Sequence, residues 1–136
     1  MWVLKGIVII RVNGRLWSRR GNLVVLDGIY DILDLMVGQG SIPSYIAVGT
    51  GTTAPADTDT ALENEVYRTS LADSYRSGNQ AIFSAFIDAG SANGYTLSEV
   101  GLFAGDGRLI ARALIDPPIN KNSSMTITVD WVINLA

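Results

Sequence analysis

The chain has 136 residues, a formal net charge of -3, 48% hydrophobic and 17% charged residues, and neither cysteine nor histidine. A chain of this length fits one domain with a single core, and its apolar content excludes an intrinsically disordered protein. Without cysteine or histidine it lacks disulfides, thiolate metal sites and the usual base of hydrolases, and its acidity and scattered basic residues predict no nucleic-acid partner.

Residues 2–12, WVLKGIVIIRV, predict a strand that is apolar on both faces and must be covered on both. The second cover is either the rest of the domain or another subunit, in which case residues 1–20 form an N-terminal arm or hairpin between subunits. Lys5 and Arg11 interrupt the run, which is shorter than the roughly 18 apolar residues of a membrane span, so we expect no membrane insertion. The candidate interface residues are Trp2, Leu4, Ile7, Ile9 and Ile10.

A turn and a helix follow this strand. Asn13 and Gly14 predict a tight hairpin turn, because both residue types accept left-handed backbone conformations. Residues 27–37, DGIYDILDLMV, predict a helix of about three turns, with Asp27 as its N-cap and Gly38 at its end. The apolar residues at the spacing of one helix face, which we expect to pack on the core, are Ile29, Ile32, Leu33 and Met36.

Beyond the helix, the apolar period changes to two, and Gly, Pro, Asn and Asp turn signals recur about every 10 to 15 residues. Strands are predicted within 79–88 and 108–115, and a last strand over 125–135 alternates apolar and polar side chains. The pattern predicts a mainly β protein, an antiparallel, jelly-roll-like β-sandwich, in which residues 21–136 form a single β-rich structural domain.

The loop that begins GTGTTAP at Gly49 raises the question of a ligand site. It lacks the lysine and following helix of a phosphate-binding P-loop and the third glycine of the dinucleotide fingerprint. Its acidic residues could bind calcium, although their spacing is not that of an EF-hand, so this possibility stays open. Thr60 and Glu63 instead predict a capping box that starts a short helical turn. The acidic residues are Asp57, Asp59, Glu63 and Glu65.

Four charges lie among apolar strand residues, where an unpaired charge would be destabilising. We therefore expect Glu65 and Arg68, and likewise Glu99 and Arg112, to pair with each other or with backbone groups. Glu99 and Asp88 could alternatively form the carboxylate pair of a glycosidase, but no aromatic residues cluster around them as a sugar cleft requires. The sequence thus predicts no catalytic residue, no metal site and no cofactor.

Four stretches, GTGTTAP, ALENEVYR, SEVGLF and PPINK, precede the alternating last strand. Together they resemble small virion structural proteins of tailed bacteriophages, of the tail-fibre or tail-collar type, from about Gly21 to Leu135. The resemblance implies a β-rich structural module without catalysis, located in the virion and assembled in the host cytoplasm. Residues 1–20 lie outside the resemblance, and no shaft or receptor-binding tip follows Ala136, which disfavours host recognition.

The expected partners are the chain itself, as a homotrimer, and other virion proteins, which suits a surface poor in charge. The first hypothesis is a tail-fibre or collar-type attachment or assembly module that acts through protein–protein contacts. The alternative is a capsid decoration protein that stabilises the head lattice, and a third hypothesis is a glycan-binding or glycan-cleaving tail protein. The sequence leaves the position in the particle and the copy number open.

Overall fold

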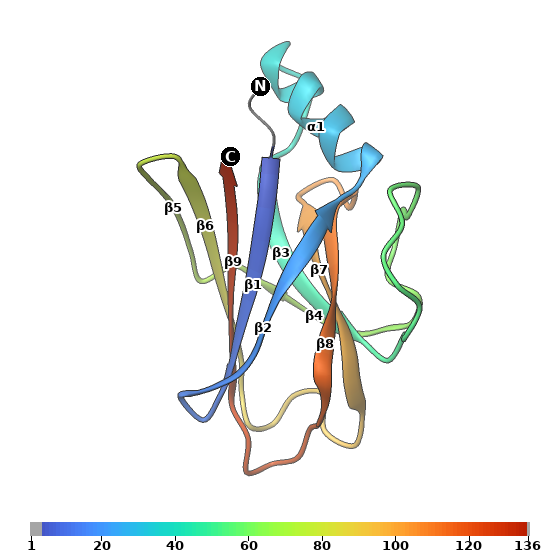
Figure 1. The fold of residues 1–136 in the computed structure, drawn as a ribbon, viewed down its shortest axis with the longest axis vertical. Helices are drawn as coiled ribbons and strands as arrows, with labels where there is room; N and C mark the ends of the chain where they lie inside the picture. Colours follow the sequence, from blue (N-terminus) through green and yellow to red (C-terminus); the bar gives the residue numbers. More distant parts are fainter. Residues whose placement is uncertain (1–3, 136) are drawn as a thin grey trace.

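The computed structural model describes residues 4–135, which form nine strands and one helix (Figure 1). The mainly β fold and the single helix are confirmed for these residues. Within them, no helix is long and apolar enough to cross a membrane. In chain order the elements are β1 (Leu4–Val12), β2 (Arg15–Val24), α1 (Leu26–Met36), β3 (Pro43–Gly49), β4 (Glu65–Ser70), β5 (Asp73–Ser77), β6 (Gln80–Ile87), β7 (Thr96–Ala104), β8 (Leu109–Asn120) and β9 (Ile127–Leu135).

The strands join in one antiparallel sheet in the order β4-β3-β7-β8-β2-β1-β9-β6-β5. The sheet turns its corner at β2, which pairs with β1 along most of its length and with β8 through Leu23 and Val24. The resulting curl brings β3 and β4 into contact with β6, and the main apolar core lies inside it. The finer prediction, a jelly-roll-like sandwich, stays a prediction.

β1 lies between β2 and β9, so both of its hydrogen-bonding edges are occupied within the chain. Val8, Ile10 and Val12 face the core, while Ile7 and Ile9 lie half-buried on the opposite face of the sheet. Ile10 is 1% exposed, so its place among the interface candidates is corrected: it is a core residue. Trp2, another interface candidate, lies outside the described residues.

The turn between β1 and β2 is confirmed. Asn13 and Gly14 have φ values of 51° and 80°, the left-handed conformations that a two-residue hairpin requires. The Asn13 side chain accepts a hydrogen bond from the Thr126 N–H and donates one to the Ser124 carbonyl. The hairpin is therefore also tied to the segment that leads into β9.

α1 begins at Leu26, and its N-cap is Val25, which makes no side-chain capping bond. The prediction that Asp27 caps the helix was wrong, because backbone contacts fix the entry instead: the Val25 N–H bonds to the Ile110 carbonyl, and the Leu26 N–H to the Asp57 carbonyl. Gly38, with φ 80°, follows the helix as predicted and donates to the Leu35 carbonyl.

The face of α1 that packs on the sheet is only partly the predicted one, since Ile29 and Ile32 are half-buried. Its buried residues are Gly28 and Asp31, whereas Leu33 and Met36 are 54% and 78% exposed. The reason is close backbone packing: a Cβ at Gly28 would lie 2.3 Å from the Ile110 carbonyl oxygen. The missing side chain at Gly28 thus decides which face of the helix turns inward.

We predict that Gly28→Ala lowers stability. Alanine would favour the helix by about 1 kcal/mol, but the overpacking against β8 should outweigh this and give a net loss of about 1–3 kcal/mol. Urea unfolding measures the difference. Gly21→Ala is the control, since the nearest atom to its added Cβ is 3.9 Å away. Equal stability of the two variants would contradict the proposed packing.

Candidate functional site

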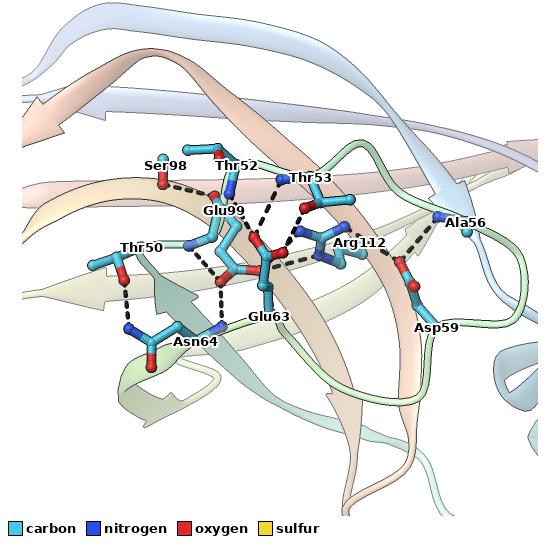
Figure 2. A network of polar contacts seen from close by, with 11 residues as sticks. Thr50, Thr52, Thr53, Ala56, Asp59, Glu63, Asn64, Ser98, Glu99 and Arg112 are labelled. Carbon is cyan, nitrogen blue, oxygen red and sulfur yellow. Dashed lines mark hydrogen bonds and ion pairs between the residues drawn. The ribbon is translucent and has the colours of Figure 1, made fainter.

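A network of polar contacts ties the loop between β3 and β4 to β7 and β8 (Figure 2). At its centre, the Glu99 side chain on β7 is 0% exposed. Its Oε2 accepts hydrogen bonds from the N–H groups of Gly51 and Asn64, at 2.7 and 2.8 Å, and its Oε1 accepts one from the Glu63 N–H at 2.9 Å. One carboxylate therefore accepts hydrogen bonds from three backbone N–H groups of a loop that has no neighbouring strand to accept them.

Arg112 on β8 supplies the opposite charge. Its Nε donates to Glu99 Oε1 at 3.1 Å, and its Nη2 lies 3.0 Å from the same oxygen. On the other side, its Nη1 donates to Asp59 Oδ2 at 3.2 Å, and that carboxylate also accepts from the Ala56 N–H. The arginine side chain is only 2% exposed, so solvent cannot screen its charge, and the carboxylates of Glu99 and Asp59 balance it instead.

The two glycines of GTGTTAP allow this approach. A Cβ at Gly51 would lie 2.4 Å from Glu99 Oε2, and one at Gly49 would lie 2.6 Å from it. The neighbouring Ser98 hydroxyl donates to the Gly51 carbonyl at 2.7 Å. The glycines therefore serve the contact with a carboxylate of the same chain.

Glu63 organises the next part of the loop. Its carboxylate accepts hydrogen bonds from the Thr53 hydroxyl and from the N–H groups of Thr53 and Thr52. These bonds, that of the Thr53 hydroxyl first, lower the pKa of Glu63. The predicted capping box with Thr60 was wrong: Glu63 bonds across the loop, and residues 60–64 form no helical turn.

Two of the other three acidic residues of the candidate calcium site also form ion pairs within the chain. Asp59 bonds Arg112, and Glu65 bonds Arg68 at 3.0 and 2.9 Å, while the Arg68 guanidinium lies 4.0 Å from the centre of the Phe103 ring. In residues 4–135, no group of three or more acidic side chains is placed to hold a metal ion.

The glycosidase alternative would need Glu99 to reach a substrate. Both of its oxygens already accept bonds from the loop or from Arg112, and the side chain has no exposed surface. Asp88 lies in the loop after β6 and accepts from the Gly90 N–H and the Ser91 hydroxyl. The network thus holds a loop in place and leaves Glu99 no free oxygen for a substrate.

A second cluster, which sequence reasoning missed, joins α1 to the β7–β8 turn. Arg108 pairs with Asp31 at 2.7 Å, with Asp34 at 2.9 Å and with Asp106 at 3.1 Å. Asp31 is buried and also accepts from the Ser41 N–H. Asp31 and Asp34, three residues apart on a mostly apolar helix, were the available signal. The cluster fixes how α1 is oriented on the sheet.

The outward face of α1 is apolar. We call Leu26, Tyr30 and Leu33 of α1, together with the C-cap residue Val37, the outer stripe; they are between 42% and 69% exposed. Met36 beside them is 78% exposed. A contiguous group of large apolar side chains on a surface marks an interaction site more often than scattered ones do.

A second apolar group crosses the outer face of β1. Ile7 pairs with Val132 on β9, which pairs with Ile82 on β6, which pairs with Tyr75 on β5. Tyr75 is exposed and the others are half-buried. Of the interface candidates, Leu4, at 36% exposed, and Ile7 and Ile9 thus have accessible surface.

The family model described as phage tail-collar fibre protein, N-terminal, matches residues 34–135. The chain belongs to this family. The match starts at Asp34 within α1 and includes strands β3 to β9, and with them the loop network on β7 and β8. No curated protein and no solved structure matches the chain. Membership identifies this tail-collar fibre family protein as a structural component of a phage tail.

For this tail-collar fibre family protein, we predict that Glu99→Gln lowers the free energy of unfolding by roughly 3 kcal/mol, because the buried Arg112 then keeps only the partly exposed Asp59 as a counter-charge. The matched control is Glu65→Gln, which breaks the partly exposed pair with Arg68 and should cost under about 1 kcal/mol. Guanidinium unfolding of both variants measures the contrast. Equal losses would show that the Glu99 network does not dominate the loop.

The lowered pKa of Glu63 predicts an acid dependence. A carboxyl group whose pKa is lower in the folded state than in the unfolded state stabilises the protein at pH values above its unfolded pKa, which is 4.5 for this group. This stabilisation is lost as the pH falls through the folded-state pKa. The melting-temperature difference between wild type and Glu63→Gln should therefore be largest near neutral pH and shrink below about pH 4. A difference that stays constant with pH would contradict this.

Proposed function

We propose that this protein is an attachment or assembly module of the phage tail fibre or collar, that it acts through protein–protein contacts, and that it works as a homotrimer. The outer stripe of α1 is the observation that carries the proposal. Large apolar side chains that lie together on one surface mark an interaction site. The four side chains of the outer stripe stay exposed within residues 4–135, although Asp27, Asp31 and Asp34 make another side of α1 acidic, and this supports contact with a further protein surface.

The loop network supports the same proposal from another side. It uses the polar groups of Glu99, Arg112 and Glu63 to hold a long loop against β7 and β8. A module that transmits contacts between other proteins needs loops that keep their shape. This use of the charges supports a structural role over the glycan-binding or glycan-cleaving alternative.

The outer face of β1 is part of the proposal. Ile7 and Ile9 lie on it, in line with Val132 and Ile82 of neighbouring strands. Because both edges of β1 are already paired, contact of residues 1–20 with another subunit would use this face rather than an added strand. The tail family favours a tail location over capsid decoration, the second candidate function.

Quantitative mass spectrometry of purified virions, combined with gold-labelled antibodies in electron microscopy, tests the proposal. We expect a small number of copies, in multiples of three, with label at the tail or neck. Hundreds of copies with label over the head would instead establish capsid decoration and contradict a tail function.

A further inference from the structure

We infer that the outer stripe of α1 is the surface through which identical copies meet, with three α1 helices lying parallel around the symmetry axis. This inference rests on the proposed homotrimer and names its contact. It starts from the free surface of α1, which projects at one end of the curled sheet, away from the β1–β2 hairpin (Figure 1).

The spacing of the stripe is that of a helix–helix seam. Its members follow one another at intervals of four, three and four residues, Leu26, Tyr30, Leu33 and Val37. Intervals of three and four residues keep apolar side chains on one face of a helix, along which a second helix can pack. The stripe carries no charged residue, so copies of it can meet without desolvating one.

The opposite face of α1 is held firmly. Arg108 pairs with Asp31 and Asp34. Gly28 packs so closely on β8 that a Cβ there would lie 2.3 Å from the Ile110 carbonyl oxygen. The helix therefore cannot rotate to bury Leu33 in the chain's own core without breaking these contacts. The apolar line is presented in one fixed direction, which lowers the entropy lost when a partner binds.

The charges beside the stripe favour a parallel arrangement. Asp27 and Asp34 flank it on one side, and Ile29 and Met36 on the other. In parallel helices, the flank on one side of the seam meets the opposite flank of the neighbour, so each acidic flank meets an apolar one. An antiparallel pair would place the two acidic flanks against each other, with like charges close together.

The exposed apolar surface on α1 supplies a large part, but not all, of the area that a standard interface buries. The stripe and Met36 together form a patch on the order of 500 Å², near the upper limit for monomeric proteins, against about 800 Å² per partner in a standard interface. An adjoining hollow of about 600 Å³ leads from Ile29 past Leu23 to Leu4, one of the interface candidates, and its lining also includes Lys5 and Asn22. The accessible surface beside α1 thus reaches the start of β1.

Leu33→Lys tests the contact, and Leu16→Lys is its matched control. Both leucines are exposed, at 54% and 62%, but Leu16 is the second residue of β2, which starts at the opposite end of the molecule from α1 (Figure 1). We expect sedimentation equilibrium to give three times the chain mass for wild type and Leu16→Lys and a threefold lower mass for Leu33→Lys. Circular dichroism and the melting curve should show that the Leu33→Lys monomer is still folded.

Single cysteines determine the orientation, since the chain has none of its own. After oxidation, Leu33→Cys should give covalent dimers on a non-reducing gel, and Leu16→Cys should not. A mixture of Leu26→Cys and Val37→Cys chains should give no crosslink between the two variants, because parallel helices keep these positions apart. A strong mixed crosslink would overturn the parallel arrangement.

A trimeric Leu33→Lys protein would overturn the inference while leaving the proposed homotrimer standing. A wild type that stays monomeric at high concentration would overturn both the inference and the homotrimer. Absence of the protein from the tail of purified virions would contradict the proposed function, whatever the sedimentation result. The three failures are therefore distinguishable.

Discussion

The structure depends on one buried carboxylate. Glu99 lies where no solvent reaches it, and it is stable there because three loop N–H groups and Arg112 surround it. The carboxylate accepts hydrogen bonds from backbone N–H groups of the long β3–β4 loop, which have no strand partner. It also balances the charge of an arginine that is buried away from water. It joins β7, β8 and the loop into one unit and leaves the site without a free reactive group.

Much of this follows from the sequence, but not all. Alternation of apolar residues predicts β9, and Asn13-Gly14 predicts the first hairpin, because both depend on local backbone chemistry. The location of charges among apolar residues points to Glu99 and Arg112. The partners of Glu63 could not be predicted, because Thr60 lies at the local capping distance while Thr53 approaches only after the loop folds back.

The helix shows a different limit of sequence reasoning. α1 has apolar residues on every side except the one with Asp27, Asp31 and Asp34, so apolar periodicity alone does not identify the inward face. Packing decides it through residues that are not apolar: Gly28, which lets the backbone approach β8, and Asp31, which bonds Arg108. Leu33 and Met36 are consequently left exposed, while Ile29 and Ile32 are half-buried. The exposed apolar side chains of α1 are the basis of the proposed contact between copies.

The central position of β9 has a mechanical consequence. β9 lies between β1 and β6 and pairs with both along its length, and it ends at the same end of the molecule as α1 (Figure 1). Because the ladder hydrogen bonds run perpendicular to the strands, tension applied along β9 would shear two ladders at once rather than open them pair by pair. A tail component built in this way resists pulling along its own C-terminal strand, in the direction in which α1 projects from the sheet.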